Sequence, residues 1–182
     1  RAAQESRGLG DVYKRQELAV TPSDNVGAAE CEFVVIATPW DAAAITARSV
    51  EDHVRNKVVV TMSNALARVD DEFVPLIPPR GSVAASVQAS LPRSKVAATL
   101  QHVPAQELGD LRQPLDSDIL ICSDDKEATD LVAEVVGKIP GTRALDCGNL
   151  SNATAIEAFT AVLLQLNTRY KTRVALKLAG LE

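Results

Sequence analysis

The chain has 182 residues, of which 46% are hydrophobic and 24% charged, and this composition is typical of one soluble domain. The formal net charge of −5 at pH 7, together with the lack of a basic stripe, argues against nucleic acid and anionic membranes as partners. Aromatic residues make up only 3% of the chain, and no apolar run approaches the roughly 20 residues of a membrane span.

Residues 6–16, SRGLGDVYKRQ, contain the Gly-x-Gly pattern with which dinucleotide-binding loops begin. Tyr13 stands where the third glycine of that loop is needed, and no apolar strand precedes the pattern. Back-translated, the stretch fits a transposase-type sequencing adapter at every codon. We therefore interpret residues 1–16 as a non-native scar and expect the native sequence to begin near Glu17, in the middle of a gene.

The first half of the chain alternates buried strands with helices. The apolar runs FVVIA at 33–37 and KVVVT at 57–61 predict strands, and the residues between them predict a helix at 42–54 capped by Asp41. Two strands joined by a helix form a parallel βαβ unit. The next expected elements are a loop at 70–79, a helix at 82–91, a strand at 95–100 and a polar connection at 101–114.

The second half continues the alternation. The expected elements are a strand at 118–122, a helix from Asp124-Asp125 to about Lys138, a strand at 143–146, a helix from Ser151 or Asn152 to about Asn167, and a weak strand at 174–178. This order predicts an α/β fold with a doubly wound parallel sheet. Such sheets bind ligands beyond the carboxyl ends of their strands, here at 38–40, 61–64 and 101–105.

The side chains at these strand ends offer little chemistry of their own. Trp40 is either a packing residue or a flat wall for a planar cofactor, and His102 is either structural or functional. The two histidines and the three cysteines, Cys31, Cys122 and Cys147, have no metal-ligand spacing, which predicts no metal site and reduced thiols in a cytoplasmic protein. Hydride transfer between bound cofactors fits this inventory, because the cofactors carry the chemistry.

Six segments resemble the coenzyme F420-dependent NADP reductases, and together they run from about Val26 to Leu181. They are VVIATPWDAA, KVVVTMSNAL, SVAASVQASLPRSKVAATLQHVPAQEL, DILICSDDKEA, IPGTRALDCGNLSNATAIEAFTAVLLQLNTRYK and VALKLAGL. The resemblance implies a Rossmann-like NAD(P)-binding fold with a small C-terminal part on the deazaflavin side, from about residue 115. It also implies reversible hydride transfer between NADPH and coenzyme F420, and we expect a homodimer.

The resemblance implies cofactor-binding roles for individual residues but no catalytic side chain. Thr38, Pro39, Trp40 and Ala44 would line the NADP side, and Asn64 would lie near the nicotinamide. The backbone of Ala105 would contact NADP, while Val103 and Val174 would lie along the deazaflavin, with His102 and Pro104 beside them. Many members of the family have a His-Asn pair where this chain has Gln101-His102, which leaves the role of His102 open.

Family members begin with a strand, a glycine-rich turn, a helix and a second strand that ends in Ser-Arg. Residues 17–182 do not contain this first βαβ portion, so we expect them to form a partial Rossmann-like domain that is inactive by itself and whose preference for NADP over NAD rests on the family. Two other interpretations of the whole protein are an NAD(P)-dependent reductase or dehydrogenase of a small organic acid, and a non-enzymatic Rossmann-like scaffold.

Overall fold

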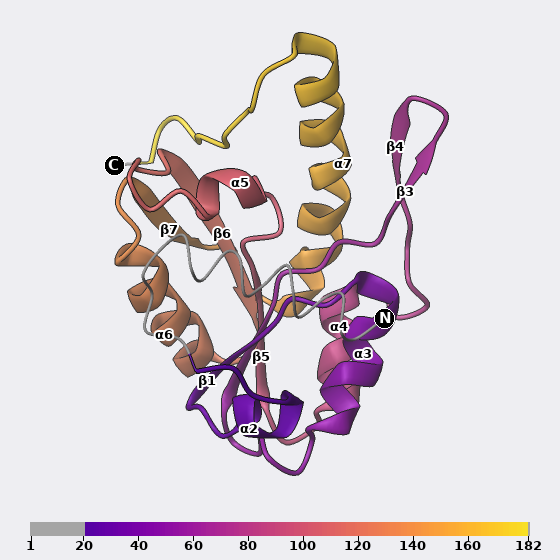
Figure 1. Cartoon of the computed structure of the whole chain (residues 1–182), viewed down its shortest axis with the longest axis vertical. Coiled ribbons are helices and arrows are strands. Elements are labelled where there is room, and N and C mark those ends of the chain that lie inside the picture. Colours follow the sequence, from indigo (N-terminus) through magenta and orange to yellow (C-terminus); the bar gives the residue numbers. More distant parts are fainter. Residues whose placement is uncertain (1–20, 182) are drawn as a thin grey trace.

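The computed structural model describes residues 21–181, and the interpreted scar at residues 1–16 lies outside this range. A five-stranded sheet forms the centre of the molecule, with the strand order β1-β2-β5-β6-β7 (Figure 1). Its strands are β1 (Phe33–Ile36), β2 (Val58–Thr61), β5 (Lys95–Thr99), β6 (Ser117–Ser123) and β7 (Thr142–Asp146). The α/β class and the Rossmann-like, mostly parallel sheet expected from the sequence are confirmed.

One pair of neighbouring strands differs from the expected parallel arrangement. β1, β2 and β5 are parallel, as are β6 and β7, but β5 and β6 pair antiparallel. The connection between β5 and β6 contains only the four-residue helix α5 (Ala105–Leu108), whereas a parallel crossover needs a longer connection, usually with a full helix. The carboxyl ends of β1, β2 and β5 therefore share one edge of the sheet with the amino ends of β6 and β7.

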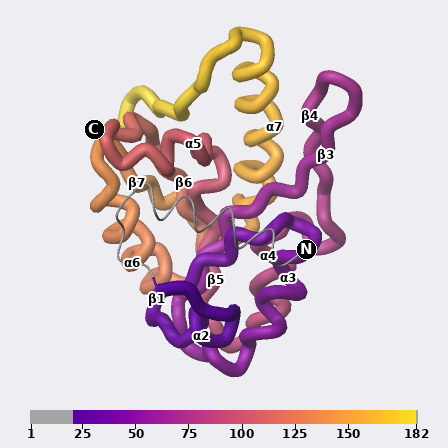
Figure 2. Tube along the Cα trace, in the orientation of Figure 1, coloured from indigo at the N-terminus to yellow at the C-terminus, as the bar shows by residue number. Residues whose placement is uncertain are grey.

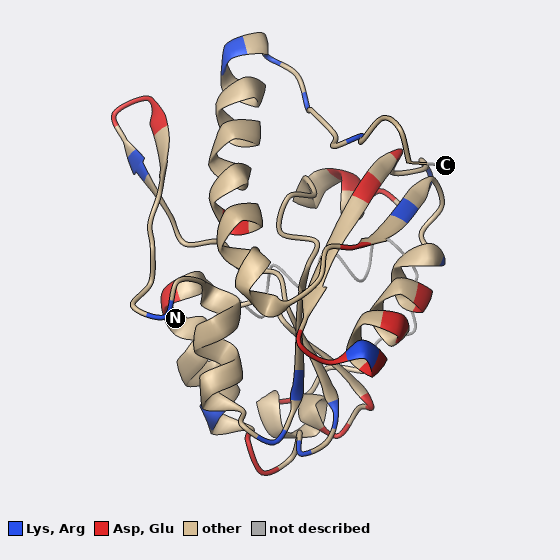
Figure 3. Ribbon diagram, turned by 180° about the vertical axis from the view of Figure 1, so that it is seen from behind, with Lys and Arg blue, Asp and Glu red and all other residues tan. Residues whose placement is uncertain are grey.

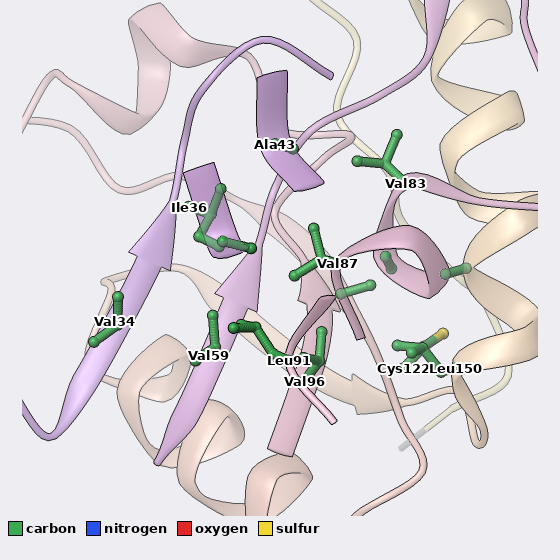
Figure 4. Close-up of a cluster of buried hydrophobic side chains, with 14 of the residues drawn as sticks. Val34, Ile36, Ala43, Val59, Val83, Val87, Leu91, Val96, Cys122 and Leu150 are labelled. Atoms are coloured by element: carbon green, nitrogen blue, oxygen red, sulfur yellow. The ribbon is translucent and has the colours of Figure 1, made fainter. Parts of the chain in front are cut away.

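Helices cover both faces of the sheet. On one face, α3 (Trp40–Ser49) and α4 (Val83–Ser90) pack with Ala43, Val87 and Leu91 against the strands (Figure 4). On the other face, α6 (Lys126–Gly137) places Val132 and Val136 against the sheet. The short helix α2 (Asn25–Ala29) precedes β1 and adds its buried Ala29 to the first cluster. Because β2 and β5 are covered on both sides, their sequences are continuous apolar runs instead of alternating ones.

Several boundaries differ from those expected. Helix α3 begins at Trp40 after Pro39, so Asp41 lies in its first turn and does not cap it, and the helix ends at Ser49. The loop expected at 70–79 is wrong, because β3 (Leu66–Val69) and β4 (Glu72–Pro75) form an antiparallel hairpin there. The residue Asp70 has a φ of 53° and makes the turn of this hairpin, which the three nearby prolines obscured in the sequence.

The C-terminal region contains one long helix and an extended tail. The 3₁₀ turn η1 (Leu150–Asn152) leads into α7 (Ala153–Tyr170), which ends where Lys171 adopts a φ of 51°. The strand expected at 174–178 is wrong: this segment runs back from the end of α7 to the sheet as an extended tail (Figure 2). Its backbone joins β6 at a single point, where the Asp118 N–H donates to the carbonyl oxygen of Leu176 at 2.8 Å.

Helix α7 is attached to the sheet layer by a buried carboxylate. The side chain of Glu157 is 4% exposed and accepts hydrogen bonds from the backbone N–H groups of Val83 at 2.8 Å and Ala84 at 3.1 Å. These are two of the otherwise unpaired donors at the amino terminus of α4, where Ser82 caps a third, the N–H of Ala85. Burial raises the pKa of Glu157 to about 6, and the two backbone hydrogen bonds oppose the rise.

We expect Glu157→Gln to destabilise the protein, because an amide supplies one acceptor where the carboxylate supplies two. One buried N–H of α4 would lose its partner, which costs about 1–3 kcal/mol of unfolding free energy in a urea titration at pH 7. Glu134→Gln on the exposed face of α6 is the matched control, and its pair with Lys138 is worth less than about 1 kcal/mol. Equal losses in the two variants would contradict the anchoring role of Glu157.

The parent chain and the Glu157→Gln variant also test how the unfolding free energy depends on pH. Because the folded pKa of Glu157 is raised, the folded protein retains this proton to a higher pH than the unfolded chain does. The stabilisation linked to that proton is present below about pH 4.5 and lost as the pH rises through about 6. The stability advantage of the parent chain over Glu157→Gln should therefore shrink across this interval. An advantage that grows instead would show that the two hydrogen bonds outweigh burial.

Candidate functional site

The carboxyl ends of β1, β2 and β5 are tied together by polar side chains. Ser63, after β2, donates its hydroxyl to the carbonyl oxygen of Thr38, after β1, at 2.7 Å. Asn64 donates its side-chain N–H to the carbonyl oxygen of Gln101, after β5, at 2.8 Å. The three strand ends that the sequence predicted to meet are thus brought together in the structure.

A cavity of about 350 Å³ opens beside these strand ends. Its walls come from the loop after β2, from residues 101–106 after β5, from α7 and from the tail. The side chains of Leu66, Val103, Leu163 and Val174 give it a mainly apolar lining, and Asn64, Gln101 and His102 contribute polar groups. Ligand pockets usually measure about 300–1,000 Å³, so this cavity has room for a planar ring system but not for two whole dinucleotide-sized molecules.

The backbone of Gln101 is held firmly at the wall of the cavity. Its carbonyl oxygen accepts the Asn64 hydrogen bond, and the hydroxyl of Thr160 on α7, which has a single proton to donate, lies 3.5 Å from the same oxygen and 3.3 Å from Oδ1 of Asn64. The preceding residue, Leu100, has a φ of 64°, a left-handed conformation that is unfavourable for a leucine. This turn ends β5 and directs the next two side chains, Gln101 and His102, into buried positions.

His102 is a neutral acceptor at this wall. Its Nε2 lies 2.9 Å from the carbonyl oxygen of Asp118, and because a carbonyl only accepts, Nε2 carries the proton. Burial lowers the pKa of His102, although the nearby Asp118 opposes the shift. Its Nδ1 therefore holds a lone pair and no proton at neutral pH. In this state the ring can accept a hydrogen bond from a ligand but cannot act as a proton donor to it.

The buried polar atoms that lack hydrogen-bond partners within residues 21–181 all gather at this edge of the sheet. They are the hydroxyls of Thr38 and Thr61, both amide atoms of Gln101, and Nδ1 of His102. Buried polar groups in folded proteins are nearly always paired, so unpaired ones call for an explanation. Their concentration at the ends of β1, β2 and β5 identifies this edge as the place where the protein is prepared for a polar ligand.

A buried ion pair fastens the tail that closes the cavity. Asp118 is fully buried and accepts two hydrogen bonds from Arg143, at 2.9 and 2.7 Å, which lower the pKa of its carboxyl group. The same carboxylate accepts the backbone N–H of Leu178 at 2.6 Å. Arg143 also donates to the carbonyl oxygens of Leu178 and Leu181. The carboxylate of Asp118 therefore anchors the tail, while its backbone carbonyl oxygen accepts the hydrogen bond from His102.

The ten residues expected to bind cofactors fall into two groups. Six of them line the cavity: Asn64, His102, Val103, Pro104, Ala105 and Val174. The other four, Thr38, Pro39, Trp40 and Ala44, lie outside it, at the end of β1 and the start of α3, with Trp40 37% exposed. The hydrogen bond between Ser63 and Thr38 connects the two groups.

Sequence reasoning missed Gln101 and the residues that α7 contributes to the cavity, including Thr160 and Leu163. Gln101 directly follows a predicted strand, which is a signal that marks it as a candidate. The inward face of α7 gave no such signal. Apolar spacing indicates that a helix face is buried, but it does not distinguish packing against the protein core from lining a cavity. Two apolar residues of this helix, Phe159 and Val162, are 38% and 49% exposed, so apolar character alone did not mark its buried side.

Among residues 21–181, no three His, Cys, Asp or Glu side chains come together in an arrangement that could hold a metal ion. Within the same part of the chain, none of the helices has both the length and the apolar character needed to cross a membrane.

Comparison with known proteins gives a consistent result at the level of sequence. The F420-dependent NADP reductase of Methanocaldococcus jannaschii is 37% identical over 158 residues, which cover 85% of this chain and 71% of that protein. The F420-dependent NADP reductase of Methanothermobacter marburgensis is 32% identical, over 91% of this chain and 76% of that protein. No family model matches the sequence.

Solved structures agree on the fold. A putative F420-dependent NADP reductase from Arthrobacter superposes with a TM-score of 0.76 at 21% identity, over 86% of this chain and 73% of that one. A hypothetical protein from Sinorhizobium meliloti gives a TM-score of 0.72, also at 21% identity, over 97% of this chain and 79% of that one. A pyrroline carboxylate reductase from Plasmodium falciparum, solved with NADP bound, gives 0.52 over 80% of this chain and 48% of that one.

We expect Arg143→Met to destabilise the protein and to release the tail, because it leaves the buried Asp118 carboxylate without its charged partner. Removing one member of a fully buried ion pair costs about 3–5 kcal/mol, and because the Arg143 side chain is 36% exposed, the loss here should fall below that range. Hydrogen exchange of the amides at 174–181 should accelerate strongly in the variant at neutral pH. The stabilisation from Asp118 is present above the usual carboxyl pKa and is lost as the pH falls through the lowered folded value.

Lys177→Met provides the matched control for the tail. Lys177 lies on the tail and pairs with Asp116, which precedes β6. Both side chains are well exposed, so loss of this ion pair should cost less than about 1 kcal/mol of unfolding free energy. Equal acceleration of exchange in both variants would mean that the tail is not held through Arg143.

Proposed function

The chain belongs to the F420-dependent NADP reductase family, and from this we propose that the cavity beside β5 receives the deazaflavin ring of coenzyme F420 while NADPH approaches from the end of β1. The enzyme is an oxidoreductase that transfers a hydride between NADPH and coenzyme F420. The observation that carries this assignment is the 37% identity over 85% of the chain to a reductase of that name. Family membership supports the interpretation as a reductase that uses NADPH and coenzyme F420. It does not support a reductase or dehydrogenase of a small organic acid, or a non-enzymatic scaffold.

The two groups of candidate residues suggest where each cofactor lies. Thr38, Pro39, Trp40 and Ala44, at the end of β1 and the start of α3, are proposed to line the NADP side. Val103 and Val174 face the cavity, which supports their proposed contact with the deazaflavin ring. This arrangement brings the two rings together near the ends of β1 and β2.

Three further residues of the site are proposed to act where the two cofactors meet. Asn64 lines the cavity and directly follows Ser63, which donates to Thr38 of the other group, and this supports a position near the nicotinamide. The backbone of Ala105, the first residue of α5, is proposed to contact NADP from the far wall of the cavity, next to Pro104.

The chemistry requires placement more than it requires reactive side chains. A nicotinamide and a deazaflavin exchange a hydride directly, so the protein must bind, orient and keep dry the two rings. Near-attack geometry brings the reacting atoms to about 3–3.5 Å, and a misplacement of about 1 Å can cost 100-fold in rate. The apolar lining by Leu66, Val103 and Leu163 excludes water. His102 is neutral, so the ring nitrogen that is free to face the cofactor rings carries no proton to donate.

The described residues support a limited affinity for NADPH. Within residues 21–181, no strand, glycine-rich turn and helix follow one another in the manner of a pyrophosphate-binding loop. Such a loop supplies much of the affinity for a dinucleotide through backbone N–H groups at a helix amino terminus. We therefore propose that residues 17–182 alone bind NADPH weakly and do not turn over.

Calorimetry with NADPH checks this proposal directly. We expect dissociation constants well above the low micromolar range for the 182-residue chain, and a gain in affinity when a family-type βαβ unit is joined before residue 17. Val35 on the edge strand β1 is 44% exposed, which supports the docking of such a unit there and predicts a higher melting temperature for the extended chain. Low micromolar binding by the shorter chain would contradict the proposal.

The assembly and location of the protein are also proposals. Helix α7 carries only Glu157 and Arg169 as charged residues, and Figure 3 shows the rest of it free of charge. Its exposed Phe159 and Val162 form an apolar strip that supports a homodimer, which light scattering would distinguish from a 19.4 kDa monomer. The free thiols of Cys31, Cys122 and Cys147 support a cytoplasmic location.

The proposed function predicts the effect of filling the cavity. In the chain extended by a family-type βαβ unit, we expect Val103→Phe to occupy space needed by the deazaflavin ring and to lower its affinity and the single-turnover hydride-transfer rate by about 100-fold. Val69→Phe, the same change at a position that is 54% exposed on β3, serves as the control. Fluorescence quenching of the deazaflavin and stopped-flow absorbance measure the two quantities. Unchanged values in Val103→Phe would place the ring elsewhere.

A further inference from the structure

Gln101 differs from Gln88, a partly buried glutamine of α4. Gln88 satisfies its whole amide: Nε2 donates to the carbonyl oxygens of Leu91 and Ser94 at 3.0 and 3.1 Å, and Oε1 accepts from the Val96 N–H at 3.2 Å. Gln101 is only 5% exposed, yet neither amide atom has a partner within residues 21–181. Gln88 is therefore a structural glutamine by the usual rule, and Gln101 breaks that rule.

The backbone at Gln101 does not depend on its side chain. Asn64 and Thr160 hold its carbonyl oxygen, and the left-handed turn at Leu100 sets the direction of the chain. An apolar residue of similar size would therefore fit the same backbone without leaving polar atoms unpaired. The chain instead retains an unfavourable amide at the cavity wall, which is a pattern expected where a group serves a ligand.

The neighbouring His102 completes a set of polar atoms at the wall. Because its Nε2–H is committed to the Asp118 carbonyl oxygen, its Nδ1 offers only an acceptor. The Gln101 amide offers one donor group and one acceptor. A ligand edge that matches this set carries a carbonyl oxygen next to an N–H.

We propose that the Gln101 side-chain amide, assisted by Nδ1 of His102, recognises a carbonyl-and-N–H edge of the ring bound in the cavity and so determines which way round that ring lies. The proposal rests on the proposed function, because two ring systems of that reaction carry such an edge. One is the imide of the deazaflavin pyrimidine ring, and the other is the carboxamide of the nicotinamide. Gln101 is on this account a positioning and specificity-determining residue.

The first test compares Gln101→Leu with Gln88→Leu in the full chain. Gln101→Leu removes unpaired buried atoms, so the melting temperature of the ligand-free protein should stay unchanged or rise, while ligand affinity should fall about 10-fold or more. Gln88→Leu breaks three hydrogen bonds, so its melting temperature should fall, whereas the intrinsic affinity of the remaining folded protein should not change. If Gln101→Leu lowers the melting temperature as Gln88→Leu does and leaves affinity unchanged, Gln101 is a structural residue and the proposal is overturned.

The second test uses ligands that lack the N–H. The probes are a deazaflavin riboside with its N3-methylated form, and NADPH with its 3-acetylpyridine analogue, measured by ligand-observed NMR at up to millimolar concentration. If the imide is recognised, the parent chain should prefer the unmethylated deazaflavin about 10-fold, and Gln101→Leu should lose that preference. If the carboxamide is recognised, the preference and its loss should appear with the NADPH pair instead.

The outcomes separate this role from the function itself. Loss of discrimination in Gln101→Leu with either pair supports the proposal and identifies the source of the edge. Equal discrimination by the parent chain and the variant overturns the role of Gln101 while leaving the reductase assignment intact. Failure of the parent chain to bind any deazaflavin would contradict the proposed function, and with it the proposal.

Discussion

The carbonyl oxygen of Gln101 is the point at which the separate parts of the site are joined. It accepts a hydrogen bond from Asn64, which follows β2, and the hydroxyl of Thr160, on α7, lies 3.5 Å from it and 3.3 Å from Oδ1 of the same Asn64. The sheet edge and the C-terminal helix are thereby fixed relative to each other at the wall of the cavity. A cavity between two elements keeps a constant width only if such cross-links exist, because apolar packing alone is not directional.

Helix α7 is positioned by two contacts that lie three residues apart on one of its faces. Glu157 reaches the amino terminus of α4, and Thr160 reaches Gln101. Residues at this spacing share a helix face, so the same side of α7 is fastened to both layers of the fold. The next inward residues, Leu163 and Leu164, then line the cavity. Along α7, the residues that attach the helix to the rest of the fold thus come first, and the residues that line the cavity follow them.

Much of the central fold was accessible from the sequence because burial on both faces leaves a clear pattern. The runs at Phe33 and Val58 predicted β1 and β2 for this reason, and the helix expected at 82–91 matches α4, whose start Ser82 caps. The hairpin of β3 and β4 was not accessible, because its residues are half-exposed and their pairing depends on a turn at Asp70. The antiparallel pairing of β6 depends on the shortness of a connection that looked like an ordinary loop.

The location of the candidate site was predictable from the sequence, but some of the residues that form it were not. Parallel strands predicted that their carboxyl ends would share an edge, and the structure brings Asn64 and His102 to one cavity there. The importance of Gln101 follows only from the absence of partners for its amide, and the sequence carries no record of which hydrogen bonds remain unmade. The tail is similar: its attachment depends on a single buried pair, Asp118 with Arg143, that lies 25 residues apart in sequence.

Asp118 links the cavity to the end of the chain in both directions. Its carbonyl oxygen holds His102, and its carboxylate holds Leu178 and, through Arg143, Leu181. Thermodynamic reciprocity applies to any two events that share such a node. If release of the tail weakens the binding of a ring against His102 by some factor, the bound ring must hold the tail more tightly by the same factor. With such a coupling, the amides of Leu178 and Leu181 would respond to occupancy of a cavity that neither residue lines.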